Sequence, residues 1–212
     1  MTVAPFSVLA ARHDPPLDHL ALAIAAQFRA VDAAAALAQL DALGKEVAAA
    51  GEDRLAALVD VLALRHGYAG DEEDYDDPSN SMLDVVIERR RGLPILLSIL
   101  YVVVARRAGL ALEGVGLPGH YVVARFDPGP TVLLDPFGGG APIEADDPED
   151  VRPWGAHETA LRMLNNLVGS YARRSDLGRA IRAAEMRLEL GVQGAPTEAL
   201  GAELRALRAR LN

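Results

Sequence analysis

Cysteine is absent from all 212 residues of this chain. Without a thiol, the chain can form no disulfide bond, and it offers no thiolate as a nucleophile or as a ligand for zinc or an iron–sulfur cluster. Every mechanism that begins with attack by a cysteine is therefore excluded. This absence restricts the possible functions more than any other feature of the composition.

Long apolar runs are also lacking. The longest, residues 93–105, is shorter than the roughly 20 residues that a membrane-spanning helix needs. Residues 1–12 show no basic segment followed by an apolar run, which is the pattern of a secretory signal peptide. We therefore expect a soluble, cytoplasmic chain with no membrane partner.

A basic surface is missing as well. The net charge is −9, and the acidic segments 71–77 and 144–150 carry −6 and −5, so the rest of the chain is close to neutral. The longest basic run is Arg89-Arg90-Arg91. Proteins that bind duplex nucleic acid present a basic face. We therefore do not expect nucleic acid as a partner.

The acidic segment 71–77 has two interpretations. Its composition is typical of a solvated linker, and we favour that interpretation. A calcium-binding loop is the alternative, but the glycine at the turn of an EF-hand is missing. The arginines at 89–91 fit a helix end that pairs with this acidic segment, with an anion site as the alternative.

Residues that hold metals or cofactors form no recognisable motif. The five histidines are scattered and include no His-x-x-x-His pair on a helix. Gly138-Gly139-Gly140 is not followed by the lysine of a phosphate-binding loop, so we interpret it as a turn. We predict neither a metal nor a cofactor.

Apolar residues at helical spacing predict helices in three parts of the chain. The N-terminal part has helices over residues 17–28, 32–50 and 52–65, and Asp32 can cap the second. A short helix over 80–90, ended by Gly92, precedes a helix from Pro94 to Ala108. This helix is apolar nearly all round and should be buried. Three further helices are predicted over residues 157–173, 176–190 and 197–211.

Strand patterns lie between the buried helix and the last three helices. Candidate strands are residues 113–117, 121–126 and 131–135, and Asp127-Pro128-Gly129-Pro130 makes a good turn between the last two. The glycines at 138–140 and Pro142 are predicted to end the sheet. The pattern indicates an α+β fold with a helical part at 1–66, an α+β core at 67–155 and a helical tail at 156–212.

The predicted hairpin brings one histidine close to one carboxylate. With the turn at 127–130, Val122 faces Asp135, and His120 lies two residues away on the same face. His120 and Asp135 are then diagonal neighbours with backbones about 7–8 Å apart, within reach of each other's side chains. A carboxylate beside an imidazole is the base and orienting group of a nucleophilic triad. A structural histidine is the alternative interpretation.

The missing member of such a triad is the nucleophile. A helix N-terminus favours an anionic nucleophile, but the buried helix begins with Pro94-Ile95-Leu96-Leu97, which cannot attack a substrate. Ser98 is the first nucleophilic side chain, one turn inside the helix. Its place in an apolar helix favours a core position, and a serine nucleophile needs a base in contact.

Four motifs resemble, in order, the bacterial SirB-type family, whose members combine a transglutaminase-like core with a tetratricopeptide-like tail. They are Asn80-Ser81, then Glu88-Arg89-Arg90-Arg91-Gly92-Leu93-Pro94, then Glu113-Gly114-Val115-Gly116-Leu117-Pro118-Gly119-His120, then Leu134-Asp135-Pro136-Phe137-Gly138-Gly139. The segment 162–167 also resembles the start of that tail. The resemblance covers about residues 20–190.

The resemblance implies a transglutaminase-like core of the papain-like superfamily, with helices packed on a small antiparallel sheet. It places Pro94 where the catalytic cysteine of this superfamily stands, and His120 and Asp135 at the histidine and aspartate positions. A Gly-x-Pro segment commonly replaces the cysteine region in the SirB-type family, as Gly92-Leu93-Pro94 does here.

Three functions are compatible with these residues. The first is a non-catalytic binding or regulatory protein on a degenerate thiol-enzyme scaffold, with a protein or peptide as partner. The second is a serine-dependent hydrolase or acyltransferase using Ser98, His120 and Asp135. The third is an interaction module that acts through the helical tail. An exposed Ser98 next to His120 would favour the enzyme, and a serine buried in the core would not.

Overall fold

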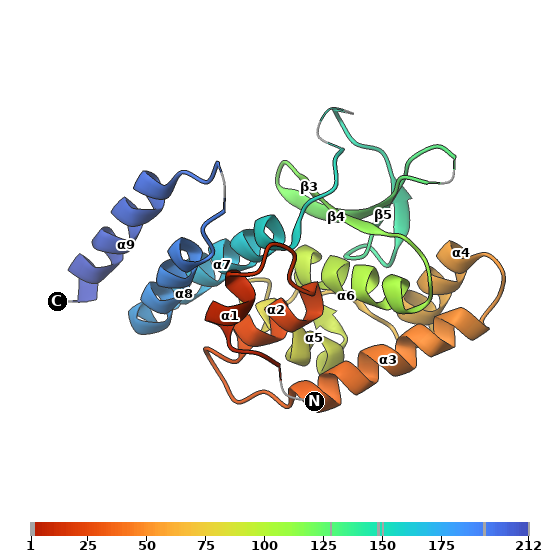
Figure 1. Ribbon diagram of the computed structural model, residues 1–212, viewed down its shortest axis with the longest axis horizontal. Helices are drawn as coiled ribbons and strands as arrows, with labels where there is room; N and C mark the ends of the chain where they lie inside the picture. Colours follow the sequence, from red (N-terminus) through yellow and green to blue (C-terminus); the bar gives the residue numbers. More distant parts are fainter. Residues whose placement is uncertain (1–2, 128, 148, 150, 193, 212) are drawn as a thin grey trace.

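The computed structural model describes residues 3–127, 129–147, 149, 151–192 and 194–211. Helix α6 (Pro94–Arg107) runs through the middle, with an antiparallel sheet on one side and helices of the N-terminal part on the other (Figure 1). The C-terminal helices extend away from this centre, and α9 (Thr197–Leu211) lies outermost. The predicted α+β class is confirmed.

The N-terminal part contains the three predicted helices and one more. They are α1 (Phe6–Ala10), α2 (Leu17–Ala25), α3 (Ala33–Ala49) and α4 (Arg54–Val59), which continues as a π-helix over Asp60–Arg65. Asp32 caps α3 as predicted, because its carboxylate accepts the backbone N–H of Ala35 at 3.0 Å. The short α1 was not predicted, since five residues carry too little periodicity to be recognised.

The short helix before α6 differs from the prediction at both ends. It begins as a 3₁₀-helix, Pro78–Ser81, and continues as α5 (Leu83–Arg89). Arg90, in the left-handed conformation with φ 60°, ends it instead of Gly92. Gly92 belongs to strand β2 (Arg91–Gly92) and packs against Val86, where a Cβ would meet a methyl carbon at 2.6 Å.

The main sheet has four antiparallel strands in sequence order. They are β3 (Glu113–Leu117), β4 (His120–Arg125), β5 (Val132–Asp135) and β6 (Ala141–Ile143). The prediction that the sheet ends at the glycines and Pro142 is wrong, because β6 pairs with β5. A proline fits here because β6 is an edge strand within the described residues, where a missing N–H can face away from the ladder.

The register between β4 and β5 follows the prediction. Val123 faces Leu134 and Arg125 faces Val132, the same alignment that sets Val122 opposite Asp135. The predicted turn includes Pro128, which lies outside the described residues. A second, parallel pair joins β1 (Ala69–Gly70) to β2 and was not predicted.

One hydrophobic core joins the predicted parts of the chain. Every residue of α6 from Pro94 to Ala105 is buried, as its apolar pattern predicted. The same core contains Leu22 of α2 and Leu164 of α7 (Ala156–Arg173). Helix α8 (Leu177–Glu189) packs on α7. No helix in the described part of the chain is both long and apolar enough to cross a membrane. The divisions at 66/67 and 155/156 stay predictions.

Candidate functional site

His120 and Asp135 lie side by side at the ends of neighbouring strands. The Nε2 atom of His120 is 3.1 Å from Oδ1 of Asp135, and the side chains are 32% and 18% exposed. His120 opens β4 directly after a two-residue turn in which Gly119 has φ 70°. The predicted proximity of the two side chains is confirmed, and both are accessible to solvent in part.

The turn after β5 orients the carboxylate of Asp135. The backbone N–H of Phe137 donates to Oδ1 of Asp135 at 2.9 Å, so the same oxygen faces both this N–H and the imidazole. Gly140 closes the turn, because its N–H donates to the carbonyl of Asp135 at 2.7 Å. These two backbone hydrogen bonds direct the carboxylate toward the histidine.

Phe137 is in turn held by residues far away in the chain. Its carbonyl accepts the backbone N–H of Gly70 at 3.0 Å, and its ring lies against the same glycine. The ring of Tyr75 meets Phe137 edge-on with centroids 6.1 Å apart. Sequence reasoning missed these contacts, because no local pattern joins residues 70 and 75 to residue 137.

A buried tyrosine of α6 lies beneath the turn that carries Asp135. Burial raises the pKa of Tyr101, and the charge of Asp135 raises it further. Its hydroxyl has no hydrogen-bond partner among the described residues. A Cβ on Gly140 would come within 3.0 Å of this hydroxyl, which explains why a residue without a side chain stands there.

The N-terminus of α6 is closed to solvent. Pro94 is the first residue of the helix and is buried, and its neighbours Leu93 and Ile95 are 3% and 1% exposed. Proline suits this position because its missing N–H has no partner at a helix start. The position that the resemblance assigns to a nucleophile therefore carries an inert side chain within the core.

Ser98 is also part of the core. It is 0% exposed, and its hydroxyl donates to the backbone carbonyl of Tyr121 at 3.2 Å. The structure thus brings Ser98 to the strand that begins with His120, but it directs the hydroxyl at a backbone acceptor. A serine-dependent enzyme would need a solvent-exposed serine next to His120, and Ser98 is not exposed.

Residues 27–177 match the family model of the transglutaminase-like superfamily. The chain belongs to this superfamily.

Two bacterial relatives and one mammalian relative illustrate the range of similar proteins. A UPF0162 protein of Xylella fastidiosa (strain 9a5c) is 37% identical over 156 residues, which cover 65% of this chain and 56% of the relative. A UPF0162 protein of Pseudomonas aeruginosa is 33% identical over 135 residues, which cover 61% of this chain and 49% of the relative. F-box only protein 21 of Mus musculus is 29% identical over 164 residues, which cover 68% of this chain and 25% of the relative.

The chain spans about half the length of these bacterial relatives. No solved structure matches it significantly.

One glycine pattern of this transglutaminase-like chain has a purely structural explanation. Residues 114–119 spell G-x-G-x-x-G, but they lie in the β3–β4 hairpin and not between a strand and a helix, where a dinucleotide site requires them. A Cβ on Gly114 would collide with the hydroxyl of Tyr121 at 2.3 Å, and one on Gly116 with the ring of Trp154 at 2.1 Å. Gly119 supplies the positive φ of the turn.

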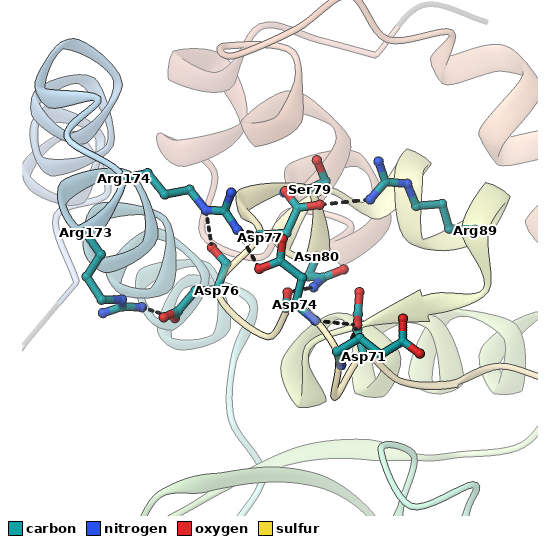
Figure 2. Close-up of polar contacts among 10 residues, drawn as sticks. Asp71, Asp74, Asp76, Asp77, Ser79, Asn80, Arg89, Arg173 and Arg174 are labelled. Atoms are coloured by element: carbon teal, nitrogen blue, oxygen red, sulfur yellow. Dashed lines mark hydrogen bonds and ion pairs between the residues drawn. The ribbon is translucent and has the colours of Figure 1, made fainter.

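The acidic segment lies at the surface, as expected of a solvated linker, but ion pairs anchor it from two sides. Figure 2 shows Arg173 and Arg174 on one side of the segment and Arg89 on the other. Arg173 pairs with Asp76, Arg174 with Asp74, and Arg89 with Asp77 at 2.9 Å. The pairing predicted for the triple arginine is confirmed at Arg89. No cluster suited to a metal ion occurs among the described residues.

Asp77 interacts with both a backbone N–H and a guanidinium. Burial alone would raise the pKa of Asp77, but the backbone N–H of Ser79 and the guanidinium of Arg89 outweigh it. The pKa of Asp77 therefore lies below its ordinary value. Asp77 also caps the 3₁₀-helix that follows, because its carboxylate accepts the N–H of Ser79 at 2.9 Å.

A pocket of about 400 Å³ lies beside the acidic segment and does not include His120 or Asp135. Phe28 and Tyr171 form an aromatic wall, with ring centroids 5.4 Å apart. The arginines at its rim are already paired with carboxylates, as Arg179 is with Asp176. These arginines are therefore not free to pair with an anionic ligand. We place the candidate site at His120 and Asp135 instead.

Aromatic contacts join the tail to the same strand as His120. The hydroxyl of Tyr121 is 2.7 Å from the hydroxyl of Thr159 on α7, and burial raises the pKa of Tyr121 to about 12. The guanidinium of Arg162 lies over the rings of both Tyr121 and Trp154, at 5.6 and 5.8 Å from their centroids. Helix α7 is thereby fixed against β4.

Proposed function

We propose that this chain is a non-catalytic binding protein of the SirB-type group, with a protein or peptide as its partner. One observation carries the proposal. His120 and Asp135 are in contact and partly exposed, while α6 begins with a buried proline in a chain without cysteine. The pair can accept and donate hydrogen bonds, but nothing beside it can form a covalent intermediate by thiol chemistry.

The chemistry of the pair suits a polar group of a peptide. With Nε2 of His120 facing the carboxylate, Nδ1 is the ring nitrogen left for a bound group. A backbone or side-chain N–H of a peptide can donate to it. Tyr75 is half exposed and packs on the ring of Phe137, whose backbone N–H donates to Asp135, so these rings offer apolar surface on the turn that carries Asp135.

Ser98 gives no support to the serine-dependent alternative, because its hydroxyl is buried and donates to Tyr121. The alternative that the tail acts as a tetratricopeptide-like interaction module remains compatible with the helices α7 to α9. We favour the His120 surface because two groups of complementary chemistry are arranged there and are partly exposed.

The test is to select peptides that bind the purified chain from a random peptide library, and to measure their affinity for variants. We expect His120→Ala to weaken binding about tenfold or more, as the loss of a hydrogen bond and its contacts implies. His13→Ala, which removes an exposed histidine elsewhere, should leave affinity unchanged. Peptides that bind both variants equally would place the binding site away from His120.

Two enzymatic activities of the purified chain are measured in parallel. Amine incorporation into a glutamine peptide and hydrolysis of activated esters should both stay at the level of the uncatalysed reaction. An ester hydrolysis that Ser98→Ala abolishes would overturn the proposal and support the serine-dependent enzyme.

A further inference from the structure

The acidic segment 71–77, called the acidic loop below, connects the tail to the turn that carries Asp135. On the tail side, Arg173 and Arg174 at the end of α7 bind Asp76 and Asp74, and Nε of Arg174 also donates to the carbonyl of Asp76 at 3.1 Å (Figure 2). These partners lie about 100 residues apart in the chain. The loop is thus held by the tail as much as by its own neighbours.

On the other side, the acidic loop holds Phe137. The loop starts directly after Gly70, whose N–H donates to the carbonyl of Phe137, and Tyr75 in its middle packs against the Phe137 ring. The N–H of Phe137 is the group that donates to Asp135. A continuous series of contacts therefore runs from the arginines of α7 through Tyr75 and Phe137 to Asp135 and His120.

The position of the loop depends on charge. Its seven residues carry six carboxylates, which repel one another, and the last turn of α7 presents the negative end of a helix dipole to them. Arg173 and Arg174 offset both effects at the point of contact. Without these two arginines, the repulsion between the carboxylates and the end of α7 is uncompensated at the residues on either side of Tyr75.

We propose that the ion pairs of Arg173 and Arg174 with the acidic loop hold the Phe137 turn in place and so keep Asp135 directed at His120. The end of α7 then regulates the candidate binding pair: whatever engages these two arginines releases the loop and loosens the pair. This regulation rests on the proposed function, since it acts on the same site.

The test is amide hydrogen exchange by NMR on the full chain. The reporter is the Phe137 amide, because its hydrogen is the one donated to Asp135. In Arg173→Glu/Arg174→Glu we expect its exchange to rise at least about fivefold, as repulsion replaces two exposed pairs. The amide of Leu100, inside buried helix α6, reports global opening and should not change.

Two further variants make the result specific. Adding Asp74→Arg and Asp76→Arg to the double variant reverses both pairs and should bring Phe137 exchange back to within about twofold of the original rate. Arg205→Glu/Arg210→Glu makes the same charge change on exposed positions of α9 and should have no effect.

Unchanged Phe137 exchange in the double variant, or an equal rise at Leu100, overturns the inference. The readout needs no partner, so it is independent of the peptide experiment. If Phe137 exchange responds as expected but no peptide binds in a way that depends on His120, only the proposed function is wrong. If peptide binding depends on His120 but Phe137 exchange does not respond to the double variant, only the proposed regulation is wrong.

Discussion

The ring of Phe137 lies so close to Gly70 that a Cβ on the glycine would come within 2.5 Å of three ring carbons. Gly70 also donates its N–H to the carbonyl of Phe137 at 3.0 Å. The two residues are 67 positions apart, and their contact fixes the turn that orients Asp135. The absence of a side chain at position 70 is therefore a requirement of the candidate site.

Gly70→Ala should destabilise the chain by about 1–3 kcal/mol, the usual cost of an added methyl in a filled space. The cost should fall when Phe137→Leu is present, because the smaller side chain leaves room. Urea unfolding of the two single variants and the double variant measures this coupling. Gly178→Ala, at an exposed helical position without close neighbours, should be neutral or slightly stabilising. Equal costs for Gly70→Ala in both backgrounds would show that the ring is not the obstacle.

His120 should carry its hydrogen on Nε2 when neutral. This nitrogen faces Oδ1 of Asp135 at 3.1 Å, and a carboxylate can only accept. Long-range proton–nitrogen NMR should show Nδ1 as the unprotonated nitrogen. The hydrogen on Nε2 should exchange with water more slowly than that of the exposed His13, and Asp135→Ala should remove this protection. A hydrogen found on Nδ1 would contradict the orientation of the pair.

The ion pair between Asp77 of the acidic loop and Arg89 of α5 should be lost at low pH. Because the pKa of Asp77 is lowered in the folded chain, its charge stabilises the fold fully above its unfolded pKa of about 4. This stabilisation disappears as the pH falls through the lowered folded pKa. Asp77→Asn keeps the helix cap but removes the charge. Urea unfolding between pH 5 and about 3 should therefore show a smaller loss of stability in Asp77→Asn than in the parent chain.

The comparison variant is Asp127→Asn, which removes a carboxylate from an exposed position. It should follow the pH dependence of the parent chain. If Asp77→Asn does so as well, the pairing of Asp77 with Arg89 does not contribute to stability.

The tail should not fold by itself. Its first helix, α7, contacts the core through Thr159 and Arg162, and Met163, Leu164 and Leu167 are fully buried in the shared core. Helical repeat arrays usually need about three repeats for stability, and three helices bury little surface alone. A fragment of residues 156–212 should be largely unfolded by circular dichroism and show no cooperative melting. A cooperative transition in the fragment would identify the tail as an independent domain.

Local patterns predicted much of the fold correctly. The register of β4 and β5 follows from one turn and a two-residue repeat, so the contact of His120 with Asp135 could be worked out from sequence. The burial of α6 follows from its apolar surface. Strand β6 was missed because its three residues include a proline and give no alternating pattern.

The sequence by itself determined that thiol chemistry is impossible here, since composition alone decides whether a cysteine exists. It also determined the hairpin that pairs His120 with Asp135. Only the tertiary structure decided that the start of α6 is closed, that Ser98 faces the backbone of Tyr121, and that Arg174 anchors Asp74. Those contacts join residues up to about 100 positions apart, and packing at such separations leaves no periodic signal along the chain.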